Sequence, residues 1–459
     1  MIYRLARHTP TSQTFWGCDD TDTGGVLGVV VDGSQYTGDT LAAADNYCGL
    51  VTVDNLASGV HTYQMALDGV LQDVQHEFTT APQSGEDVDL ILTGDCLEAN
   101  PSFANLVANE SADAFYASEW TYIDGGEYEA APCGAASLVT LRATYDERGA
   151  TADPDYSAFL DSYRIKQRCT LSNPANKWRR EFIKRFPTRL FWNNHEFYSL
   201  IALPWNPAPG ENQFDAAYKA ASEYEFMGNP INTDSDLDSV PSTVVYTRET
   251  IGDVEIISTD GTSYNDDALA NLLDGQALGR GEGKQFAWIK DRIAASTAKF
   301  LIIFHTTSIP DNTEWNHATT GILKALEDKD QTAIIIGANI HRAHARQINL
   351  NMPTRPIMEF GASPLRQESN SAVAALSGDV VYFEDSVATT FTGVYEPGAR
   401  EKAAWCYAKV SIRPNGSDDY VDSHMKVEIK NALTSAVRWS CIIPEGSREP
   451  NIRANAAVI

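Results

Sequence analysis

The chain has 459 residues, of which 43% are hydrophobic and 20 are prolines. This composition argues against wholesale disorder, and the length exceeds one ordinary core, so we expect two domains or one large domain with an appended module. The formal net charge is −27, and the resulting long-range repulsion opposes general binding to a nucleic-acid backbone or an anionic membrane. The densest basic run, KWRREFIKR at residues 177–185, reads as a solvated helix face or, alternatively, as a patch that guides anions.

The sequence lacks recognisable targeting segments. No window reaches the ~18 apolar residues that a membrane-spanning helix needs. The opening residues also lack the apolar core of a secretory signal. We therefore expect no membrane span and a protein that is cytoplasmic or associated with a particle, in which case it has an assembly partner.

Residues 1–85 read as short β-prone runs separated by turns. In HTYQMALDG, residues 61–69, apolar and polar positions alternate and an Asp-Gly pair closes the run. That pattern is typical of a half-buried strand leading into a turn. We expect an all-β sandwich of the immunoglobulin or fibronectin type over residues 1–85, followed by the polar linker APQSGED at residues 81–87.

Residues 86–459 show a second pattern, in which aliphatic strands alternate with helical segments. KFLIIFHTTS (299–308) and TAIIIGANIH (332–341) are nearly continuous apolar runs, as in strands buried on both faces. The apolar spacing over residues 283–296 predicts an amphipathic helix, residues 211–226 predict another, and strands return between residues 380 and 445. We expect one mixed α/β or α+β domain over residues 86–459.

Seven cysteines are present, and none lies in a CxxC or zinc-ribbon spacing. Cys96 directly follows an apolar strand, and we consider it below as a metal ligand. The default for the other six is a buried small hydrophobic residue. They are Cys18, Cys48, Cys133, Cys169, Cys406 and Cys441.

Polar side chains with ligand or acid-base chemistry follow five of the apolar strands. A single histidine at a strand end is more often a hydrogen-bonded structural residue. Five such ends in one chain nevertheless favour a site, because sites in α/β sheets collect at the carboxyl ends of strands. These side chains are Asp95, Cys96, Glu119, Tyr122, Asn194, His195, Glu196, His305, Asn339, His341 and His344.

The order and spacing of these strand ends resemble the PhoD-like alkaline phosphatases, which belong to the calcineurin-like metallophosphoesterase superfamily. The matching phrases are FTTAP (78–82), a strand ending at Cys96, SEWTY (118–122), WNNHE (192–196), LGRGEGKQFAWI (278–289) and GANIH (337–341). The resemblance implies a four-layer αββα metallophosphatase-like sandwich that follows the β-sandwich.

This chain departs from the family motifs at charged positions. Glu119 stands for the acid of GDxxY, Asn193 and Asn194 replace both acids of WDDHE, and Asn339 replaces the acid of GDxH. The arginines of a phrase such as LDTRSYR are absent from STDGTSYN, residues 258–265. Each change weakens the case for ordinary phosphatase activity, and the three asparagines and the missing arginines also remove charge.

The resemblance implies two metal ions bridged by an anionic ligand, for which Glu119 is the candidate. A thiolate and a phenolate favour a strongly Lewis-acidic ion, so we expect Fe(III) at the first position and a divalent ion (calcium, zinc or manganese) at the second. Asp95 is an alternative ligand. The first ion would be bound by Cys96, Glu119, Tyr122 and His341, and the second by Glu119, Asn194, His305 and Asn339.

The function that follows is metal-dependent hydrolysis of a phosphomonoester or phosphodiester by a metal-bound hydroxide. His195 would donate a proton to the leaving group, Glu196 would orient it, and Asn194 would act beside it. The main alternative is a catalytically degenerate structural or binding protein, such as a virion or surface component. A carbohydrate-active hydrolase is a third interpretation. His344 is either an outer partner of His341 or a surface residue.

Overall fold

The computed structural model describes the chain in segments, and these form two compact units. Unit 1 comprises Met1–Ala81 with Glu119–Asn229, and unit 2 comprises Pro82–Ser118 with Pro230–Ile459. Residues 119–229 therefore pack with the N-terminal strands, and the domain division at residue 85 stays a prediction. The described residues are 1–94, 96, 100–121, 133–136, 141, 156–193, 196, 212–230, 246–261, 284–306, 315, 319–338, 343–348, 356–362, 380–384, 405–417, 419–447 and 450–451.

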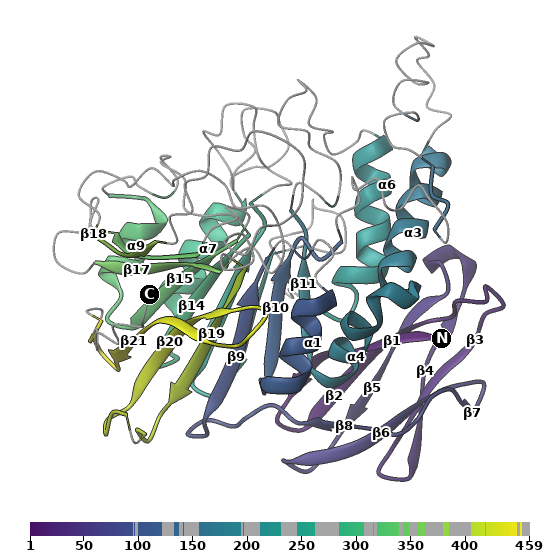
Figure 1. Cartoon of the computed structure of the whole chain (residues 1–459), viewed down its shortest axis with the longest axis horizontal. Helices are drawn as coiled ribbons and strands as arrows, with labels where there is room; N and C mark the ends of the chain where they lie inside the picture. Colours follow the sequence, from purple (N-terminus) through teal and green to yellow (C-terminus); the bar gives the residue numbers. More distant parts are fainter. Residues whose placement is uncertain are drawn as a thin grey trace. The chain divides into compact units, whose positions relative to one another are not determined.

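Unit 1 begins with two antiparallel sheets, drawn in purple in Figure 1. One has the order β1-β2-β5; in the other β4, β3 and β6 are consecutive, and β7 and β8 both pair with β6. Phe15 and Val51 of the first sheet share a hydrophobic core with Val29 and Tyr63 of the second. The strands are β1 (Ile2–Thr9), β2 (Ser12–Cys18), β3 (Gly25–Val31), β4 (Ser34–Leu41), β5 (Cys48–Asp54), β6 (Val60–Leu67), β7 (Val70–Leu71) and β8 (His76–Thr79).

Two Asp-Gly pairs close hairpins in the second of these sheets. Asp32 and Gly33 join β3 to β4, and Asp68 and Gly69 join β6 to β7. All four have positive φ, at 48°, 82°, 49° and 76°. Two successive left-handed residues make the turn that matches the twist of antiparallel strands, and glycine takes the second position without strain. The turn expected after HTYQMAL is confirmed.

The rest of unit 1 is mainly helical, and α3 packs against α6. The helix expected over residues 211–226 is present, but its last five residues, Ser222–Phe226, form a π-helix. Such wider turns are often found near functional sites. The elements are α3 (Tyr156–Ser172), α4 (Lys177–Arg185), β11 (Thr188–Phe191), α6 (Asn212–Ala221), the π-helix η4 (Ser222–Phe226) and the short turns η1 (Ala43–Asp45) and η3 (Pro174–Asn176).

The basic run of residues 177–185 forms helix α4, and part of its charge is used inside unit 1. Arg179 is 2% exposed, lies 4.9 Å from the centroid of the Trp120 ring and donates to the Trp120 carbonyl at 3.1 Å. Lys184 pairs with Asp73 at 2.5 Å. The solvated-face interpretation is therefore wrong for Arg179, although Arg185 at the end of the run is exposed.

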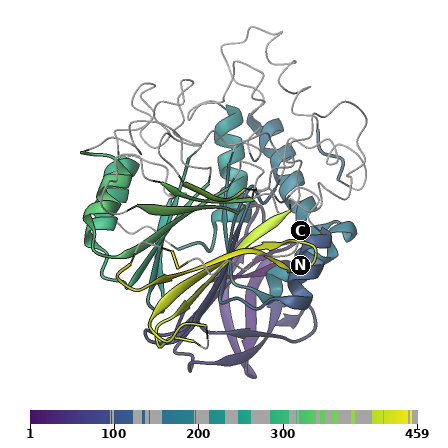
Figure 2. The same ribbon diagram turned by 60° about the vertical axis from the view of Figure 1, so that its left-hand side comes forward.

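Unit 2 contains two β-sheets, which Figures 1 and 2 show from two directions. Within the unit, one sheet has the order β10-β9-β19-β20-β21 and the other has the order β12-β13-β14-β15-β17-β16-β18. The strands are β9 (Val88–Thr93), β10 (Ala114–Ser118), β12 (Thr247–Ile251), β13 (Val254–Thr259), β14 (Phe300–His305), β15 (Thr332–Gly337), β16 (Ala343–Ile348), β17 (Ile357–Ala362), β18 (Val380–Glu384), β19 (Cys406–Arg413), β20 (His424–Asn431) and β21 (Val437–Pro444), and the helices are α1 (Asn100–Asn109), α7 (Lys284–Ala295) and α9 (Ile322–Asp328).

Strands β14 and β15 are buried along their whole length, as their continuous aliphatic runs predict. One face of their sheet packs on α7 and α9, with Ile303 and Ile335 in one cluster with Ile289 and Leu326. The helix expected over residues 283–296 is thereby confirmed as α7. Its apolar face covers the strands that end at the predicted site.

The opposite face of this sheet meets the other sheet of unit 2. The ring of Phe304 on β14 lies 6.1 Å from that of Tyr116 on β10, and Phe360 on β17 lies 5.8 Å from Trp439 on β21. On the far side of β10, Phe115 contacts Phe103 of α1. Helices therefore cover the outer face of each sheet.

One expectation about the cysteines is wrong. Cys133 and Cys169 form a disulfide in unit 1, with Cα atoms 5.7 Å apart. Connectivity of this kind cannot be read from the sequence because the two residues meet only after folding. The other described cysteines are buried and form no disulfide: Cys18, Cys48, Cys96, Cys406 and Cys441. For all of them except Cys96, the predicted metal ligand, burial is the expected state.

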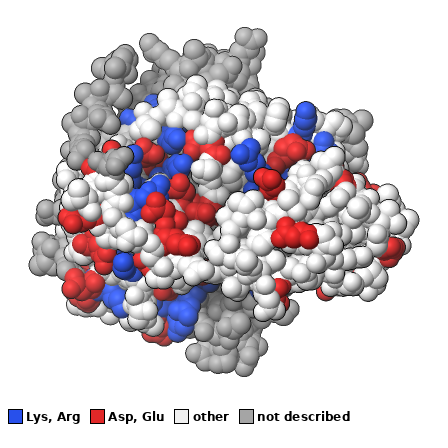
Figure 3. Space-filling model, turned by 90° about the horizontal axis from the view of Figure 1, so that it is seen from below, with Lys and Arg blue, Asp and Glu red and all other residues white. Residues whose placement is uncertain are grey.

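The surface carries acidic and basic side chains in close proximity. On the face seen in Figure 3, basic groups lie among acidic groups. Ion pairs such as Arg413–Asp89 at 2.7 Å and Lys426–Asp419 at 3.1 Å belong to unit 2. In the described part of the chain, no helix is both long and apolar enough to cross a bilayer.

Candidate metal centre

Three parallel strands of unit 2 end side by side where the sequence predicts a site. Thr259 at the end of β13 is the register partner of His305 at the end of β14, and His305 is the partner of Gly337 at the end of β15. The carboxyl ends of parallel strands meet at one edge of the sheet. The backbone therefore places the imidazole of His305 centrally on that edge.

The His305 side chain is fully buried, at 0% exposure. Its Nδ1 atom lies 2.5 Å from Thr259 Oγ1, and its Nε2 atom has no hydrogen-bond partner within the described residues. Burial lowers the pKa of His305 to about 3, and the charge of Glu359 only partly opposes this. The imidazole is therefore neutral near pH 7, which is the form that binds metal ions.

The hydrogen bond to Thr259 indicates which nitrogen of His305 can bind a metal ion. When Nδ1 carries the proton and donates to Oγ1, the lone pair of Nε2 is available. Metal-binding histidines commonly hold one ring nitrogen in this way while the other coordinates. A buried nitrogen without a partner is costly unless a ligand satisfies it. The geometry and charge state of His305 therefore fit a metal ligand.

Two further side chains fix the segment that follows β13. Gln285 of α7 accepts a hydrogen bond from Asp260 N at 2.8 Å and donates one to Asp260 O at 2.9 Å. Thr306 Oγ1 accepts from Gly261 N at 3.1 Å. The sequence offered a signal for Gln285, since it lies in LGRGEGKQFAWI, but none for the roles of Thr259 and Thr306.

A buried ionic cluster on β16 and β17 lies near this edge. Arg346 and Glu359 are register partners and form an ion pair, and His344 Nε2 lies 3.6 Å from Glu359 Oε2. Burial alone would raise the pKa of Glu359, but Arg346 and His344 bring it to about 2. Glu359 is therefore a fixed negative charge. His344 is 2% exposed, so its interpretation as a surface residue is wrong.

Cys96 belongs to the same unit and follows β9. It is 0% exposed. Thr93, the last residue of β9, donates to the carbonyl of Ala362 on β17 at 3.0 Å, so the end of β9 is tied to the sheet that carries His305. A buried thiol beyond a strand end fits either a small core residue or a metal ligand.

Glu119, the predicted bridging ligand, begins the second segment of unit 1 and directly follows β10 in sequence. Its side chain is 0% exposed, and its backbone has a φ of 51°. Its N–H donates to Phe191 O at 3.2 Å. A left-handed glutamate costs free energy, and such conformations collect at functional sites.

Glu196 is also buried in unit 1, and both of its oxygens accept backbone hydrogen bonds. Oε2 accepts from Asn193 N at 2.7 Å and Oε1 from Thr121 N at 3.3 Å. The N–H of Glu196 in turn donates to Asn193 O at 3.2 Å. The side chain thus closes its own turn, in the manner of the glutamate in a capping box.

A second buried acid lies close to Glu196. Gln167 of α3 donates to Glu225 Oε1 at 2.7 Å and accepts from Thr121 Oγ1 at 3.0 Å. Burial raises the pKa of Glu225 to about 7. Burial and the charge of Glu225 also raise the pKa of Glu196 well above its usual range.

Six of the predicted site residues lie outside the described residues, so their roles stay predictions. Among the residues that the structure describes, no group of three or more His, Cys, Asp and Glu side chains is arranged to hold a metal ion. The six site residues that lie outside the described part of the chain are Asp95, Tyr122, Asn194, His195, Asn339 and His341.

The similarity of this chain to known proteins concerns mainly its fold. No protein-family model matches the chain. A segment of 113 residues is 29% identical to one subunit of the aspartyl/glutamyl-tRNA(Asn/Gln) amidotransferase of Helicobacter hepaticus, covering 25% of this chain and 21% of that protein. The chain spans about a fifth of that protein's length, and so short a match shows no family.

Two solved structures superimpose on nearly the whole chain. PhoD does so with a TM-score of 0.64 and 14% identity, over 96% of this chain and 90% of that chain. The purple acid phosphatase PPD1 from yellow lupin (Lupinus luteus) seeds gives a TM-score of 0.58 at 9% identity, over 96% of this chain and 74% of that chain. At these identities the likeness concerns the fold alone. The mixed sheets of this chain therefore have a fold of the kind seen in PhoD and in this purple acid phosphatase.

Proposed function

We propose that the chain is a metal-dependent phosphoesterase that hydrolyses a phosphomonoester or phosphodiester. The observation that supports this most is the neutral, buried His305, whose Nε2 has no hydrogen-bond partner within the described residues. It lies at the carboxyl end of β14, in a fold shared with PhoD and a purple acid phosphatase. Such a nitrogen is suited to bind a metal ion.

The proposed ligands follow the strand ends. Bound metal ions would supply the Lewis acidity that lowers the pKa of water and neutralises phosphate charge. The burial of Cys96, Glu119 and His305 is compatible with this, and Asp95 remains an alternative ligand. Fe(III) would take Cys96, Glu119, Tyr122 and His341, and a divalent calcium, zinc or manganese ion would take Glu119, Asn194, His305 and Asn339.

His195 would protonate the leaving group in this reaction. Glu196 supports the assignment through its bonds to Asn193 N and Thr121 N, because they hold the described residues on either side of Asn194 and His195 in the sequence. The proposed role of Glu196 is therefore to hold the backbone of this segment as well as to orient the imidazole. Asn194 would supply an amide oxygen as a ligand in place of a carboxylate.

The test combines metal analysis with substrate hydrolysis. Purified chain is analysed for bound metals by mass spectrometry and assayed with nitrophenyl phosphate, bis-nitrophenyl phosphate and a nitrophenyl ester. We expect bound metal and hydrolysis of at least one phosphate ester, but not of the carboxylate ester. His305→Ala should lose metal and activity by more than the roughly 100-fold typical of losing an outer partner.

His424→Ala is the matched control. His424 is also buried in unit 2, but Nδ1 and Nε2 lie 2.8 Å from Asp422 O and 3.3 Å from Ser417 Oγ. His424→Ala should keep its metal, because both ring nitrogens of His424 have hydrogen-bond partners in the wild type and neither is proposed to bind metal. Equal metal content in both variants would contradict the assignment of His305.

The alternative is a degenerate structural or binding protein with the same fold. The amides at Asn193, Asn194 and Asn339 favour it, because they remove negative charge that would hold cations. A folded chain that binds no metal from solutions of ferric, zinc, manganese or calcium salts, and hydrolyses no phosphate ester, would establish this alternative. One bound ion without turnover would indicate a structural metal.

A further inference from the structure

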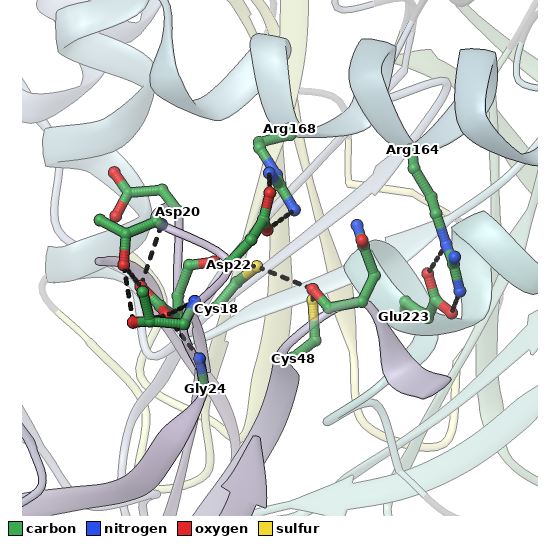
Figure 4. Close-up of polar contacts among 12 residues, drawn as sticks. Cys18, Asp20, Asp22, Gly24, Cys48, Arg164, Arg168 and Glu223 are labelled. Atoms are coloured by element: carbon green, nitrogen blue, oxygen red, sulfur yellow. Dashed lines mark hydrogen bonds and ion pairs between the residues drawn. The ribbon is translucent and has the colours of Figure 1, made fainter. Parts of the chain in front are cut away.

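Two free cysteines lie opposite each other in the first sheet of unit 1. Cys18 is the last residue of β2 and Cys48 is the first residue of β5, and the two are register partners. Both are buried and neither is in a disulfide. Figure 4 shows the two side chains near the surface ion pair of Arg168 and Asp22. Nothing in the proposed phosphoesterase reaction uses this pair.

The backbone at this position has the spacing that a disulfide needs. Asp19 N donates to Tyr47 O at 2.9 Å, which makes these neighbours the hydrogen-bonded pair and places Cys18 and Cys48 at the non-hydrogen-bonded position. Opposing Cα atoms at such positions are about 4.5 Å apart. Disulfides span Cα separations of about 4.4–6.8 Å. This spacing lies within the disulfide range, so the register of the two strands is compatible with a covalent link.

The sulfur atoms also converge on one point. Cys18 Sγ lies 3.5 Å and Cys48 Sγ lies 3.6 Å from the same oxygen, the carbonyl of Asn46. Burial raises the pKa of the Cys48 thiol, and its hydrogen bond with Cys18 adds to this effect. The two thiols are thus direct neighbours, so a reactive sulfur on one is within reach of the other.

A polar layer next to the thiols connects them to the surface. Tyr224 of the π-helix places its hydroxyl 3.9 Å from Cys18 Sγ and accepts from Asn46 Nδ2 at 2.5 Å. Arg168 of α3 donates to the same hydroxyl at 3.3 Å and pairs with Asp22 through bonds of 3.0 and 2.8 Å. The Asp22 side chain is 50% exposed. Local opening of this layer would give a small oxidant access to the pair.

We propose that Cys18 and Cys48 are an oxidation site that a peroxide converts reversibly into a disulfide. One thiol gives up its proton and attacks a peroxide oxygen, so that the O–O bond breaks and a sulfenic acid and water form. The second thiol attacks the sulfenic sulfur, the S–S bond forms and a second water leaves. The two thiols lose two electrons, and hydrogen peroxide is reduced to two water molecules.

The disulfide would join β2 to β5 and remove both thiol hydrogen bonds to the Asn46 carbonyl. Because the two cysteines are separated by 30 positions in the chain, the link would also restrict the unfolded state. We therefore expect oxidation to raise the thermal unfolding temperature of the chain. Reduction by dithiothreitol should reverse the rise, beyond any change that the same treatment causes in the unoxidised chain through Cys133–Cys169.

The experiment treats the intact wild-type chain with increasing hydrogen peroxide, denatures it in N-ethylmaleimide and maps its peptides by mass spectrometry. We expect a Cys18–Cys48 cross-linked peptide, with both residues losing alkylation together, and recovery after dithiothreitol. Cys406 and Cys441, buried thiols of unit 2, serve as controls and should stay alkylated. Either thiol oxidised to sulfinic acid without a cross-link would overturn the proposal. So would full alkylation of both at a dose that oxidises methionines of the same chain.

Variants add a readout that does not depend on peptide recovery. Cys48→Ser should abolish both the cross-link and the peroxide-induced rise in unfolding temperature. Cys441→Ser, which removes a buried thiol from β21, should keep both. An unchanged rise in Cys48→Ser would contradict the assignment even if that variant is less stable before oxidation.

Discussion

His305 in unit 2 and Glu225 in unit 1 are both completely buried titratable groups, and they differ in what burial leaves them able to do. Burial favours the neutral form of each, so the pKa of His305 falls to about 3 while that of Glu225 rises to about 7. Neutral imidazole is a good metal ligand, whereas a neutral carboxyl group is not. The same physical effect therefore prepares one region for a ligand and makes the other a structural network.

The hydrogen bonds of the two regions follow this division. Nδ1 of His305 lies beside Thr259, but its Nε2 has no hydrogen-bond partner among the described residues. In unit 1, Gln167 bonds Glu225, and both oxygens of Glu196 accept from backbone N–H groups. Three of the four carboxyl oxygens of Glu225 and Glu196 thus have hydrogen-bond partners, and Glu225 Oε2 has none among the described residues. A change at Glu225 should alter stability, whereas a change at His305 should alter metal binding.

His195 precedes Glu196 in the sequence, and we expect its removal to reduce activity more than the other substitutions reduce stability or affinity. His195→Ala should lower phosphate-ester turnover by roughly 10²–10⁴-fold, the usual contribution of a positioned proton donor. Its thermal unfolding should match the wild type. The control His76→Ala, a change in β8, should leave turnover unaltered. Unchanged turnover in His195→Ala would refute the proton-donor role.

Glu225→Gln should stabilise the chain at high pH, because ionisation of the buried Glu225 carboxyl group destabilises the folded state. The folded chain holds the Glu225 proton up to about pH 7, whereas the unfolded chain releases it near the ordinary pKa of 4.5. The folded state thus binds more protons between these values, so stability falls as pH rises from 4.5 to 7. A difference from 4.5 to about 7 corresponds to about 3 kcal/mol at 1.36 kcal/mol per pKa unit.

The free energy of unfolding of Glu225→Gln, measured with urea, should therefore exceed that of the wild type by up to this amount at pH 8, and by less at pH 5. Glu77→Gln removes an exposed carboxylate from β8 and should show no such pH-dependent gain. A gain of equal size at both pH values in Glu225→Gln would mean that titration of Glu225 is not its source.

Thr259→Val tests whether the hydroxyl beside His305 contributes to metal binding. Valine keeps the shape of threonine but removes the oxygen next to His305 Nδ1, so the ring loses the bond that orients it. We expect a 10–100-fold increase in the dissociation constant for the second metal ion, as is typical when an outer partner is lost. Thr259→Ser retains the hydroxyl and should restore most of the affinity, measured by metal titration calorimetry. Equal affinities for the two variants would exclude a positioning role.

The sequence predicted those features that depend on local pattern. Alternation and an Asp-Gly pair predicted the turn at Asp68 and Gly69, and aliphatic runs predicted the buried strands that place His305 at a sheet edge. Contacts between distant segments could not be predicted in this way. Thr259 and His305 are 46 positions apart, and Cys133 and Cys169 are 36 apart. Chemically ordinary residues at those positions acquire their roles only through the register and packing of the folded chain.

A substitution at Gly69 in unit 1 should change stability slightly and leave metal affinity unaltered. Gly69 has a φ of 76° in the β6–β7 turn, and an added Cβ would meet only Gln35 Nε2, at 3.6 Å. Gly69→Ala therefore introduces backbone strain without a clash and should lower the free energy of unfolding by about 1–2 kcal/mol. Gly69→Asn, which tolerates the left-handed region better, should lose less. Neither change should alter metal affinity, because the described contact that orients His305, with Thr259, lies within unit 2. A loss of metal affinity in Gly69→Ala, measured at a temperature where the chain is folded, would show that the two regions are energetically coupled.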